Sequence, residues 1–464
     1  MLSNNFPTGG GLDVNGYTKT ARIKPTLPSI SAGDIVQSNS VFSRMNNYWG
    51  LTNAAPYYCT MIKLREATST VYGIIFCVYS DSNKNLWGVF IRYGTDGNWS
   101  TPNPPVQITT SPAQSQPKLY LARGNDTVIL MHSRAAGGSP GVFIKCLHVV
   151  PDGLVQGTDY IGHGPEYYLY DTHYEYFDIC GLNSEFQSMR VLTCGRDYTG
   201  QTKLRVCEVE QGSFSMTIGA VSTPGMTPSG QTLTYIRPNQ AYFAVTTSNG
   251  YMDDKCIITS GLTVTAITGV TGRTLFQNGT HLLATNRLTE FTYVNHYIVT
   301  DVNMMASQYF TVNGDPASSI TRKSFWTFPT SSSTPVAVAQ AARGVFVEDR
   351  NQMSIRGMYA YGASGSPSVE MIEEMVTHST LAGSIQSRVT CDANMQGGMT
   401  MIQITPTRYL VPWFLAGAPH IQIINLDFVP ELTAWNYWFG ARPGVATNSG
   451  VANEVIPFVA PENY

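Results

Sequence analysis

The sequence predicts an all-β chain whose strands fall into small repeated sheets. Three observations predict it: apolar and polar residues alternate with a period of two, turn dipeptides separate the alternating runs, and the runs group in fours. A period of two places apolar side chains on one face of a strand and hydroxyls or amides on the other. Repeated four-stranded sheets are typical of a β-propeller, whose blades protect their edges by radial packing.

The alternation and the turns can be read directly from the chain. Residues 213–218 alternate serine or threonine with Phe, Met and Ile, and residues 262–266 alternate Leu, Val and Ala with threonine. Asp-Gly and Asn-Gly pairs suit tight hairpins because these residue types tolerate a positive φ. Such pairs occur at 96–97, 152–153, 249–250, 278–279 and 313–314.

Grouping the strands gives about seven units, each a plausible four-stranded meander. The units are expected at 58–109, 118–160, 173–223, 233–267, 273–312, 323–361 and 388–426. Six or eight blades remain open because the boundary near 336–361 is ambiguous. A sandwich of two stacked sheets is the competing architecture.

The expected propeller spans residues 56–427, between an N-terminal arm at 1–55 and an aromatic-rich C-terminal tail at 428–464. One helical insertion is expected at 366–383, where Ser366 can cap a helix, Pro367 fits its first turn and apolar residues recur at helical spacing. The polar arms either pack on their own domain or reach a neighbouring subunit. Deleting residues 1–50 is therefore expected to leave a folded body that no longer assembles.

The composition limits the classes of partner. Charged residues make up 13% of the chain, about half of the roughly 25% in an ordinary globular domain. Amides and hydroxyls cost less to desolvate than ions, so this surface suits protein–protein interfaces or carbohydrate contact. The net charge of −3 gives no basis for sequence-specific nucleic-acid binding. No stretch approaches the roughly 18 apolar residues of a membrane span, so we expect no membrane insertion.

The eight cysteines form no CxxC pair, and several lie inside apolar runs such as Phe76-Cys77-Val78. We expect free thiols packed as small hydrophobes, with disulfides or metal ligation as the alternative. The first residues lack the basic and apolar regions of a secretory signal, so we expect synthesis in a reducing cytoplasm.

A tyrosine-rich stretch supplies the surface-recognition candidates. An acid, a histidine and an acid occupy alternate positions of an expected strand, which places them on one face. Tyrosines precede them, and tyrosine supplies flat contact area with little entropy to lose. A plain polar strand face and, less favoured, a metal site are the alternatives. The candidates are Tyr167, Tyr168, Tyr170, Asp171, His173 and Glu175.

No motif identifies a reaction, and we assign no catalytic residue, no metal ligand and no cofactor. Residues 137–141 match the GxSxG pattern, but they join two expected strands and predict a hairpin loop, not a nucleophile elbow.

The segment Tyr93-Gly94-Thr95-Asp96-Gly97-Asn98-Trp99-Ser100 resembles the Asp-box turn of sialidase-like and other glycan-associated propellers. In those families Asp and Gly form a hairpin turn and Trp packs between blade strands. The resemblance implies a structural role for Asp96, Gly97 and Trp99. A sialidase would also need an arginine triad, an acid Asp and a Tyr–Glu pair, and no local context singles these out.

Over its whole length the chain resembles the virion proteins of tailed bacteriophages. The resemblance lies in the low charge, the Ser/Thr/Asn/Gly-rich strands, the arm-like start Leu2-Ser3-Asn4-Asn5-Phe6-Pro7-Thr8-Gly9-Gly10-Gly11 and the aromatic tail. It implies a structural component of the virion, in the tail nozzle, hub or fibre, that acts in assembly, genome passage or host-surface attachment. Its implied partners are other virion proteins, copies of itself and, as an option, a host-surface glycan.

A glycan-binding or glycan-processing propeller enzyme is the alternative function. Arginines and carboxylates converging on the central channel would favour the enzyme. A channel lined by Ser, Thr, Asn and hydrophobes would favour the virion component.

Overall fold

The alternating segments are β-strands in the computed structural model, and the described residues contain no helix. Side chains are described within 58–322 and 400–411. The structure describes residues 18–23, 29–30, 32, 35–50, 54–113, 115–134, 141–151, 159–171, 177–228, 230–247, 251–274, 280–299, 304–329, 345–349, 352–363, 366–377, 383–391, 400–405, 408–414, 421–434, 444–446, 450–451 and 455–459.

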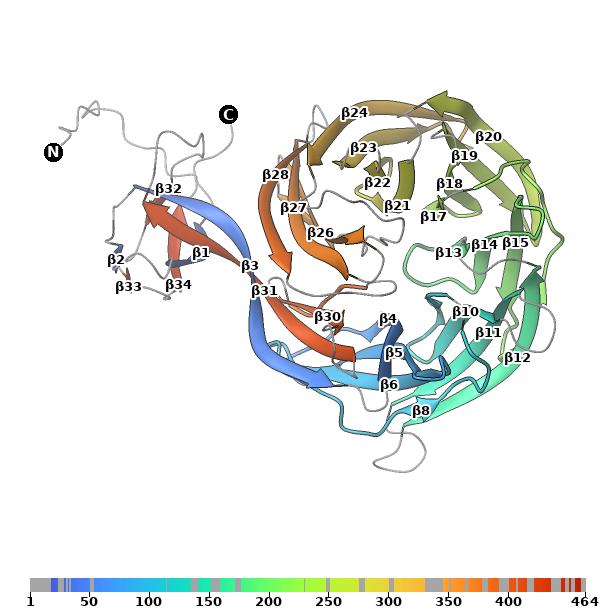
Figure 1. The fold of residues 1–464 in the computed structure, drawn as a ribbon, viewed down its shortest axis with the longest axis horizontal. Helices are drawn as coiled ribbons and strands as arrows, with labels where there is room; N and C mark the ends of the chain where they lie inside the picture. The colour runs from blue at the N-terminus through green and yellow to red at the C-terminus, as the bar shows by residue number, and fades with distance from the viewer. Residues whose placement is uncertain are drawn as a thin grey trace. The chain divides into compact units, whose positions relative to one another are not determined.

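The described strands form seven antiparallel blades arranged around an axis (Figure 1), which confirms the predicted propeller and excludes two stacked sheets. Blade 1 contains β4 (Ala54–Arg65), β5 (Gly73–Asp81), β6 (Leu86–Tyr93) and β7 (Trp99–Ser100), with β8 (Val106–Gln107) also paired to β6. Blade 2 contains β9 (Lys118–Arg123), β10 (Thr127–Arg134), β11 (Gly141–Val150) and β12 (Tyr160–Tyr170). Blade 3 contains β13 (Phe177–Gly181), β14 (Arg190–Arg196), β15 (Thr202–Val209) and β16 (Met216–Ile218).

The next three blades repeat this meander. Blade 4 contains β17 (Gly230–Arg237), β18 (Gln240–Thr246), β19 (Tyr251–Ser260) and β20 (Thr263–Thr274). Blade 5 contains β21 (Thr280–Arg287), β22 (Thr292–Val299), β23 (Met304–Asn313) and β24 (Ser319–Pro329). Blade 6 contains β25 (Val345–Asp349), β26 (Gln352–Ala363), β27 (Ser366–Thr377) and β28 (Gly383–Cys391). Within the ambiguous segment 336–361, β25 opens blade 6, and β24 completes blade 5.

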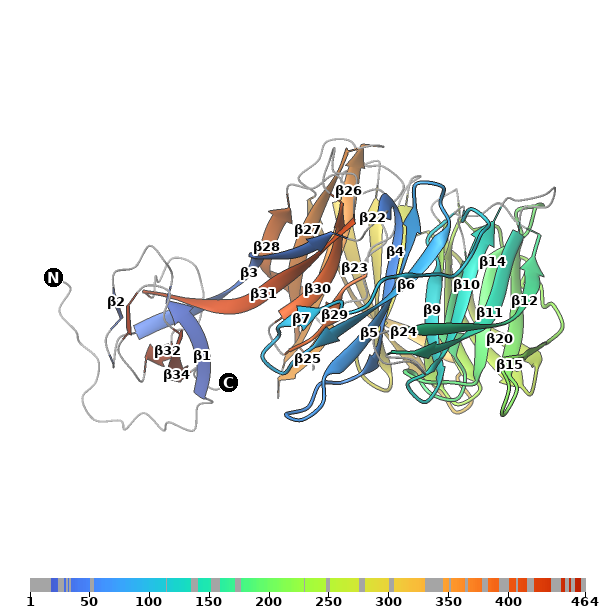
Figure 2. The same ribbon diagram turned by 90° about the horizontal axis from the view of Figure 1, so that it is seen from below.

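The core lies between neighbouring blades, which stack face to face (Figure 2). Because successive side chains of a strand point to opposite faces, a central strand contributes to two cores. In β10, Ile129 packs against blade 3 while Leu130 packs against blade 1. In β14, Val191 packs against blade 2 while Leu192 packs against blade 4. This explains why middle strands such as β5 are buried along their whole length.

Blade 7 combines the two ends of the ring. It contains β29 (Ile402–Gln403), β30 (Arg408–Phe414), β31 (Ile421–Ala434) and, as the neighbour of β31, the N-terminal strand β3 (Ile35–Gly50). A strand that precedes blade 1 thus pairs with the last blade and closes the ring (Figure 1). Residues 44–50, the end of β3, therefore belong to the propeller, and we no longer expect the deletion of 1–50 to leave an intact body.

The chain divides into two compact units. One comprises Arg44–Asp427 and holds the propeller, and the other comprises Met1–Ser43 with Phe428–Tyr464. In the second unit β1 (Thr18–Ile23) pairs antiparallel with β34 (Val455–Val459), and β34 pairs with β32 (Gly444–Ala446). Beside them β2 (Ser29–Ile30) pairs with β33 (Gly450–Val451). The two ends of the chain therefore pair with each other as strands.

The expected helix at 366–383 is wrong. Residues 366–377 form β27, which pairs with β26 from Ala363↔Ser366 to Gln352↔Thr377, and residues 383–391 form β28. Pairing on both sides, with β26 and β28, outweighs the local helical spacing of the apolar residues.

The cysteine prediction is confirmed for the residues whose side chains are described. Cys59, Cys77, Cys146, Cys180, Cys194, Cys207 and Cys256 are free and buried. Burial raises the pKa of Cys146, Cys207 and Cys256 to about 12, so these thiols are inert hydrophobes at neutral pH. No helix in the described part of the chain is long and apolar enough to cross a membrane.

Candidate functional site at the channel mouth

The innermost strands enclose a central cavity of about 500 Å³. Six blades contribute to the described lining, through β4, β9, β13, β17, β29 and Thr285 of β21. Threonine, glutamine and aliphatic side chains make up most of this wall. The seven-bladed ring thus brings together, around one axis, residues that are hundreds of positions apart in the sequence.

The charged side chains of this lining are engaged with one another, with backbone or, for Glu185, with Arg287. Lys63 Nζ lies 2.7 Å from Glu66, and Lys118 Nζ lies 3.5 Å from Asp178. Arg65 is the arginine of the described lining, and its Nε donates to Tyr72 O at 3.1 Å. The described part of the channel therefore presents no arginine triad, and no group of three or more His, Cys, Asp or Glu among the described residues could hold a metal ion.

A second cavity, of about 600 Å³, opens beside the channel and is called here the mouth cavity. It lies between the β13–β14 loop, β17 and the β21–β22 turn. Its lining includes Tyr120, Glu185, Phe186, Tyr235 and residues 285–290. These groups come from four strands or turns of blades 2, 3, 4 and 5, so the site depends on the assembled ring.

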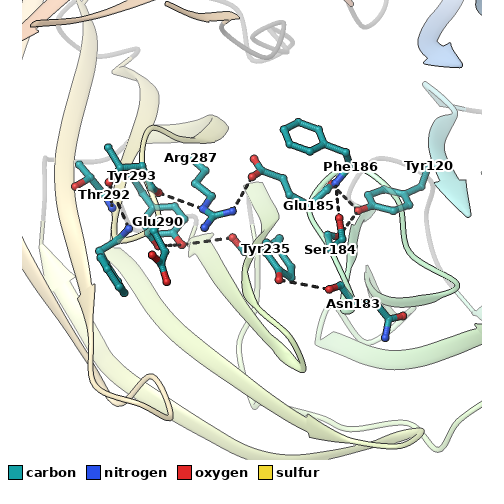
Figure 3. A network of polar contacts seen from close by, with 12 residues as sticks. Tyr120, Asn183, Ser184, Glu185, Phe186, Tyr235, Arg287, Glu290, Thr292 and Tyr293 are labelled. Carbon is teal, nitrogen blue, oxygen red and sulfur yellow. Dashed lines mark hydrogen bonds and ion pairs between the residues drawn. The ribbon is translucent and has the colours of Figure 1, made fainter. Parts of the chain in front are cut away.

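The β13–β14 loop, residues 182–189, forms one wall of the mouth cavity and is held from several sides (Figure 3). Tyr120 Oη of β9 donates to Ser184 O at 2.9 Å and to Glu185 O at 2.6 Å. Within the loop, Ser188 Oγ accepts from Asn183 N at 2.9 Å. Blades 2 and 3 together therefore fix the backbone of this loop.

Across the cavity, Glu185 reaches Arg287 at the end of β21, with Oε2 2.7 Å from Nη1 (Figure 3). Arg287 Nε donates to Thr289 O at 3.1 Å, and its guanidinium lies 5.3 Å from the centre of the Tyr235 ring. Only 15% of the Arg287 side chain and 29% of the Glu185 side chain are exposed, so the ion pair is largely shielded from solvent. It ties blade 3 to blade 5 across blade 4.

The tyrosines of the mouth cavity are hydrogen-bond donors. Burial raises the pKa of Tyr235 and of Tyr293 above their ordinary values, so both hydroxyls stay protonated at neutral pH. Tyr293 Oη donates to Tyr235 O at 3.4 Å, and Tyr235 Oη contacts Asn183 O at 3.5 Å (Figure 3). Blade 5 is thereby linked through blade 4 to the β13–β14 loop.

Phe186 differs from the other residues of this hydrogen-bonded loop because 80% of its surface is exposed. Its neighbours on both sides are engaged, since Glu185 pairs with Arg287 and Gln187 Nε2 donates to Gly124 O at 3.3 Å. Sequence reasoning missed this residue. The available signal was a single aromatic within the polar run Asn183-Ser184-Glu185-Phe186-Gln187-Ser188 between two strands.

The tyrosines predicted for surface recognition lie in or beside β12 and have different environments. Tyr170 is 2% exposed and donates to Thr193 O at 3.1 Å, so it belongs to the core. Tyr167 is partly buried, and its hydroxyl accepts from Met216 N at 3.1 Å. Tyr168 is 44% exposed and meets the Phe143 ring edge-on, with centroids 5.3 Å apart.

The remaining recognition candidates follow β12. Asp171 is exposed and hydrogen-bonds with Tyr168, while His173 and Glu175 lie outside the described residues. The β12–β13 connection and the 182–189 loop leave opposite ends of β13. Tyr170 and Asp171, the described end of the predicted recognition stretch, therefore lie toward the opposite face of the propeller from the mouth cavity.

The Asp-box-like segment forms the turn between β6 and β7. Asp96 Oδ1 accepts from Asn98 N at 3.0 Å, and Gly97 has a φ of +76°, which favours glycine. Trp99 begins β7 opposite Tyr93. Arg408 of blade 7 donates to Asp96 O at 2.5 Å, so the turn contacts the neighbouring blade. These contacts fit a structural role for Asp96, Gly97 and Trp99.

Comparison with known proteins identifies the fold and no family. No family model and no curated protein matches the sequence. The structure is similar to the core factor of S. cerevisiae, with a TM-score of 0.50 and 10% identity over 86% of this chain. The match spans 62% of the yeast chain. At this identity the likeness concerns the fold alone.

Two further solved structures resemble the chain more weakly. The BP39L lectin from Burkholderia pseudomallei matches with a TM-score of 0.45 and 12% identity, covering 87% of this chain and 98% of the lectin. The Cps50 (Swd1) β-propeller domain from Myceliophteria thermophila matches with a TM-score of 0.42 and 9% identity, covering 84% of this chain and 99% of that domain.

Proposed function

We propose that the chain is a non-catalytic binding and structural component of a larger assembly. The observation that carries this proposal is the unit formed by the two chain ends. Five consecutive residues of β1 pair with β34, from Thr18↔Val459 to Arg22↔Val455, and this unit is compact apart from the propeller. A propeller that needed only its own ring would have no use for β1, β32 and β34, which extend the sheet beyond the four strands of blade 7. A subunit of an assembly uses such an extension to join its neighbours.

The channel supports a binding role more than a catalytic one. Catalysis of glycan hydrolysis needs carboxylates held in distinct protonation states, together with cationic groups for an acidic substrate. In the described lining Glu66 and Asp178 are paired with lysines, Glu185 is paired with Arg287, and the one arginine of the lining donates to backbone. Thr, Gln and aliphatic side chains provide the rest of the surface.

The assembly we propose is the tail of a tailed bacteriophage, with this chain in the nozzle, hub or fibre. The resemblance in sequence style to virion proteins supports this assignment, as does the low charge of 13%. In this role the chain would contact copies of itself and other virion proteins within the particle.

The test is the oligomeric state of the full chain, measured by mass photometry and by electron microscopy. We expect a ring of about six copies for a nozzle or hub, or a trimer for a fibre, by the closed symmetries usual in such assemblies. Ala21→Pro removes a ladder N–H from the middle of β1, opposite Ile456, and should convert the assembly to monomers. The main thermal transition of the propeller should remain.

A second proline variant serves as the control. Gln211 is exposed in the β15–β16 turn, where Ser213 N donates to Glu210 O at 3.3 Å, and proline is well tolerated at this position of a turn. Gln211→Pro should assemble as the wild type does. A wild-type chain that stays monomeric at micromolar concentration, or an Ala21→Pro variant that assembles normally, would refute the proposal.

A further inference from the structure

Phe186 is an apolar side chain held in solvent by an ordered loop. The residues on both sides of Phe186 are held by Tyr120 and Gly124 of blade 2 and Arg287 of blade 5. The exposure of Phe186 is therefore not explained by a loop without tertiary contacts. An aromatic ring that is 80% exposed loses the benefit of burial, which bulky apolar residues ordinarily gain. An exposed aromatic residue whose neighbours on both sides are held in place is typical of a preorganised ligand-binding site.

The accessible surface around Phe186 is polar. The aliphatic and thiol groups of the mouth cavity are already buried, since Cys180, Leu233 and Leu288 are at most 5% exposed. What remains for a ligand is the exposed Phe186 ring and the partly exposed Tyr235 ring, among threonine hydroxyls, amides, the exposed Glu290 and the Glu185–Arg287 pair. An apolar helix or strand of another protein would leave these polar groups desolvated and unpaired, which costs free energy.

The charges of the cavity favour a neutral ligand. Glu185 and Arg287 neutralise each other at 2.7 Å, and Glu185 sits beside the exposed ring. The remaining charged side chain of the lining, Glu290, is exposed to solvent, which screens its charge. Their free lone pairs and N–H groups can still form hydrogen bonds, and charge-assisted hydrogen bonds to neutral hydroxyls are strong. An anionic ligand would compete with Glu185 for Arg287, and a cationic one would compete with Arg287 for Glu185. A volume of about 600 Å³ suits a small molecule or the end of a chain.

We propose that the mouth cavity binds a neutral carbohydrate. A pyranose ring offers an apolar C–H face to Phe186, and hydroxyls on its rim to Glu185 and Arg287. Because the cavity is open to solvent at the mouth, the sugar is the terminal residue or a branch of a larger glycan. This inference rests on the proposed binding function and assigns its ligand class and its site.

The experiment uses the full-length chain, fluorescently labelled, on a printed array of neutral and sialylated oligosaccharides. Binding is confirmed with the free oligosaccharides by saturation-transfer NMR and titration calorimetry. We expect neutral glycans to bind and Phe186→Ala to weaken them by about tenfold or more, as for an aromatic anchor in a binding site. Phe186→Trp keeps an aromatic face and should stay within about threefold of the wild type.

Tyr198→Ala is the matched control. Tyr198 is 72% exposed in the β14–β15 turn, at the opposite end of β14 from the 182–189 loop. Its loss should leave glycan binding unchanged. Melting temperatures of all variants should equal that of the wild type, because both aromatic rings are exposed.

Several outcomes would overturn the inference: an array on which the wild type binds nothing, binding confined to sialylated glycans, or equal affinity in the wild type and Phe186→Ala. Oligomeric state is measured in parallel. An assembled chain that binds no neutral glycan refutes the carbohydrate site and leaves the proposed assembly role standing, whereas a monomeric chain that binds one refutes the assembly role.

Discussion

His132 of β10 is a single residue that should couple pH to stability. Its side chain is 1% exposed, and Nε2 lies 3.0 Å from Glu166 Oε1. Burial lowers the pKa of His132, and the charges of Lys145 and Arg134 act in the same direction, against the raising effect of Glu166. The contact is therefore a hydrogen bond from a neutral imidazole, with Nδ1 as a buried acceptor without a partner.

The sign of the pH effect follows from this lowered pKa. In the unfolded chain the imidazole takes up a proton as the pH falls below about 6.5, while in the folded chain it stays neutral. This contribution to stability is full above that pH and is lost as the pH falls toward the folded pKa of His132. We expect the melting temperature to fall between pH 7 and pH 5, and His132→Gln to flatten the fall, as measured by differential scanning fluorimetry.

His148→Gln is the control, because His148 lies on the adjacent strand β11 with 31% of its side chain exposed. That variant should keep the wild-type pH dependence. Identical pH profiles for the wild type and His132→Gln would contradict the role given to His132.

At the same scale, the Asp96-Gly97 turn and Phe186 show which features of a site can be predicted from the sequence and which cannot. The Asp96-Gly97 turn was predictable because positive φ and a local Asp–Asn contact depend on neighbours in the chain. Phe186 was not, because its setting depends on Tyr120 and Arg287, which lie 66 and 101 positions away. The alternation of apolar and polar residues within a strand does not predict contacts with partners so distant in the sequence.

Among the strands, a buried polar chain joins blades 4 and 5. Asp254 of β19 is 2% exposed and accepts from Tyr242 Oη at 2.6 Å and from Arg322 Nη2 of β24 at 2.5 Å. Asn295 of β22 donates to Tyr242 Oη at 2.7 Å, and Thr285 of β21 donates to Asn295 at 2.5 Å. Each group in this chain has lost water and depends on its neighbour in the next strand or blade.

Removing the charge at the centre of this chain should be costly. Asp254→Asn leaves Arg322, whose side chain is 15% exposed, without its counterion, and we expect a loss of about 3 kcal/mol in the free energy of unfolding. Urea denaturation followed by tryptophan fluorescence measures it. Asp315→Asn is the matched control, because Asp315 is 77% exposed beside Arg237 and surface pairs contribute about 0–1 kcal/mol. Equal losses for the two variants would contradict the argument.

Strand β27 shows how pairing decides an element that local pattern misassigns. Its apolar residues at 369, 372, 375 and 376 satisfy a helical period, and Ser366-Pro367 provides a start signal. The blade offers twelve register pairs with β26 and a further strand, β28, on the other side. In a propeller, each blade supplies a segment with neighbouring strands, and these pairing partners cannot be predicted from the sequence of that segment alone. The repeat itself was readable, because Asp-Gly and Asn-Gly pairs fall in or beside blades 1, 2, 4 and 5 and alternating runs recur along the chain.

For the whole molecule, stability depends on closing the ring. Blade 7 takes β29, β30 and β31 from the end of the propeller and β3 from before its beginning. Without β3, β31 would be left as an edge strand with unpaired N–H and C=O groups, and such edges associate with other chains. The predicted N-terminal arm at 1–55 includes β3, because a closing strand that lies far in sequence from the rest of its blade shows no local blade pattern.

Two N-terminal deletions separate closure from assembly. Deleting residues 1–34 removes β1 and β2 and keeps β3, so the propeller should melt near the wild-type temperature while the chain no longer assembles. Deleting residues 1–50 also removes β3 and opens blade 7. The loss of one strand's pairing costs several kcal/mol of unfolding free energy. Because each kcal/mol lowers the melting temperature of a large domain by about 2–4 °C, we expect a fall of about 10 °C or more, together with aggregation. The melting temperatures of the two variants are measured by circular dichroism, and their aggregation is measured by light scattering. If both deletions melt alike, the ring does not depend on β3, and the two chain ends act in assembly alone.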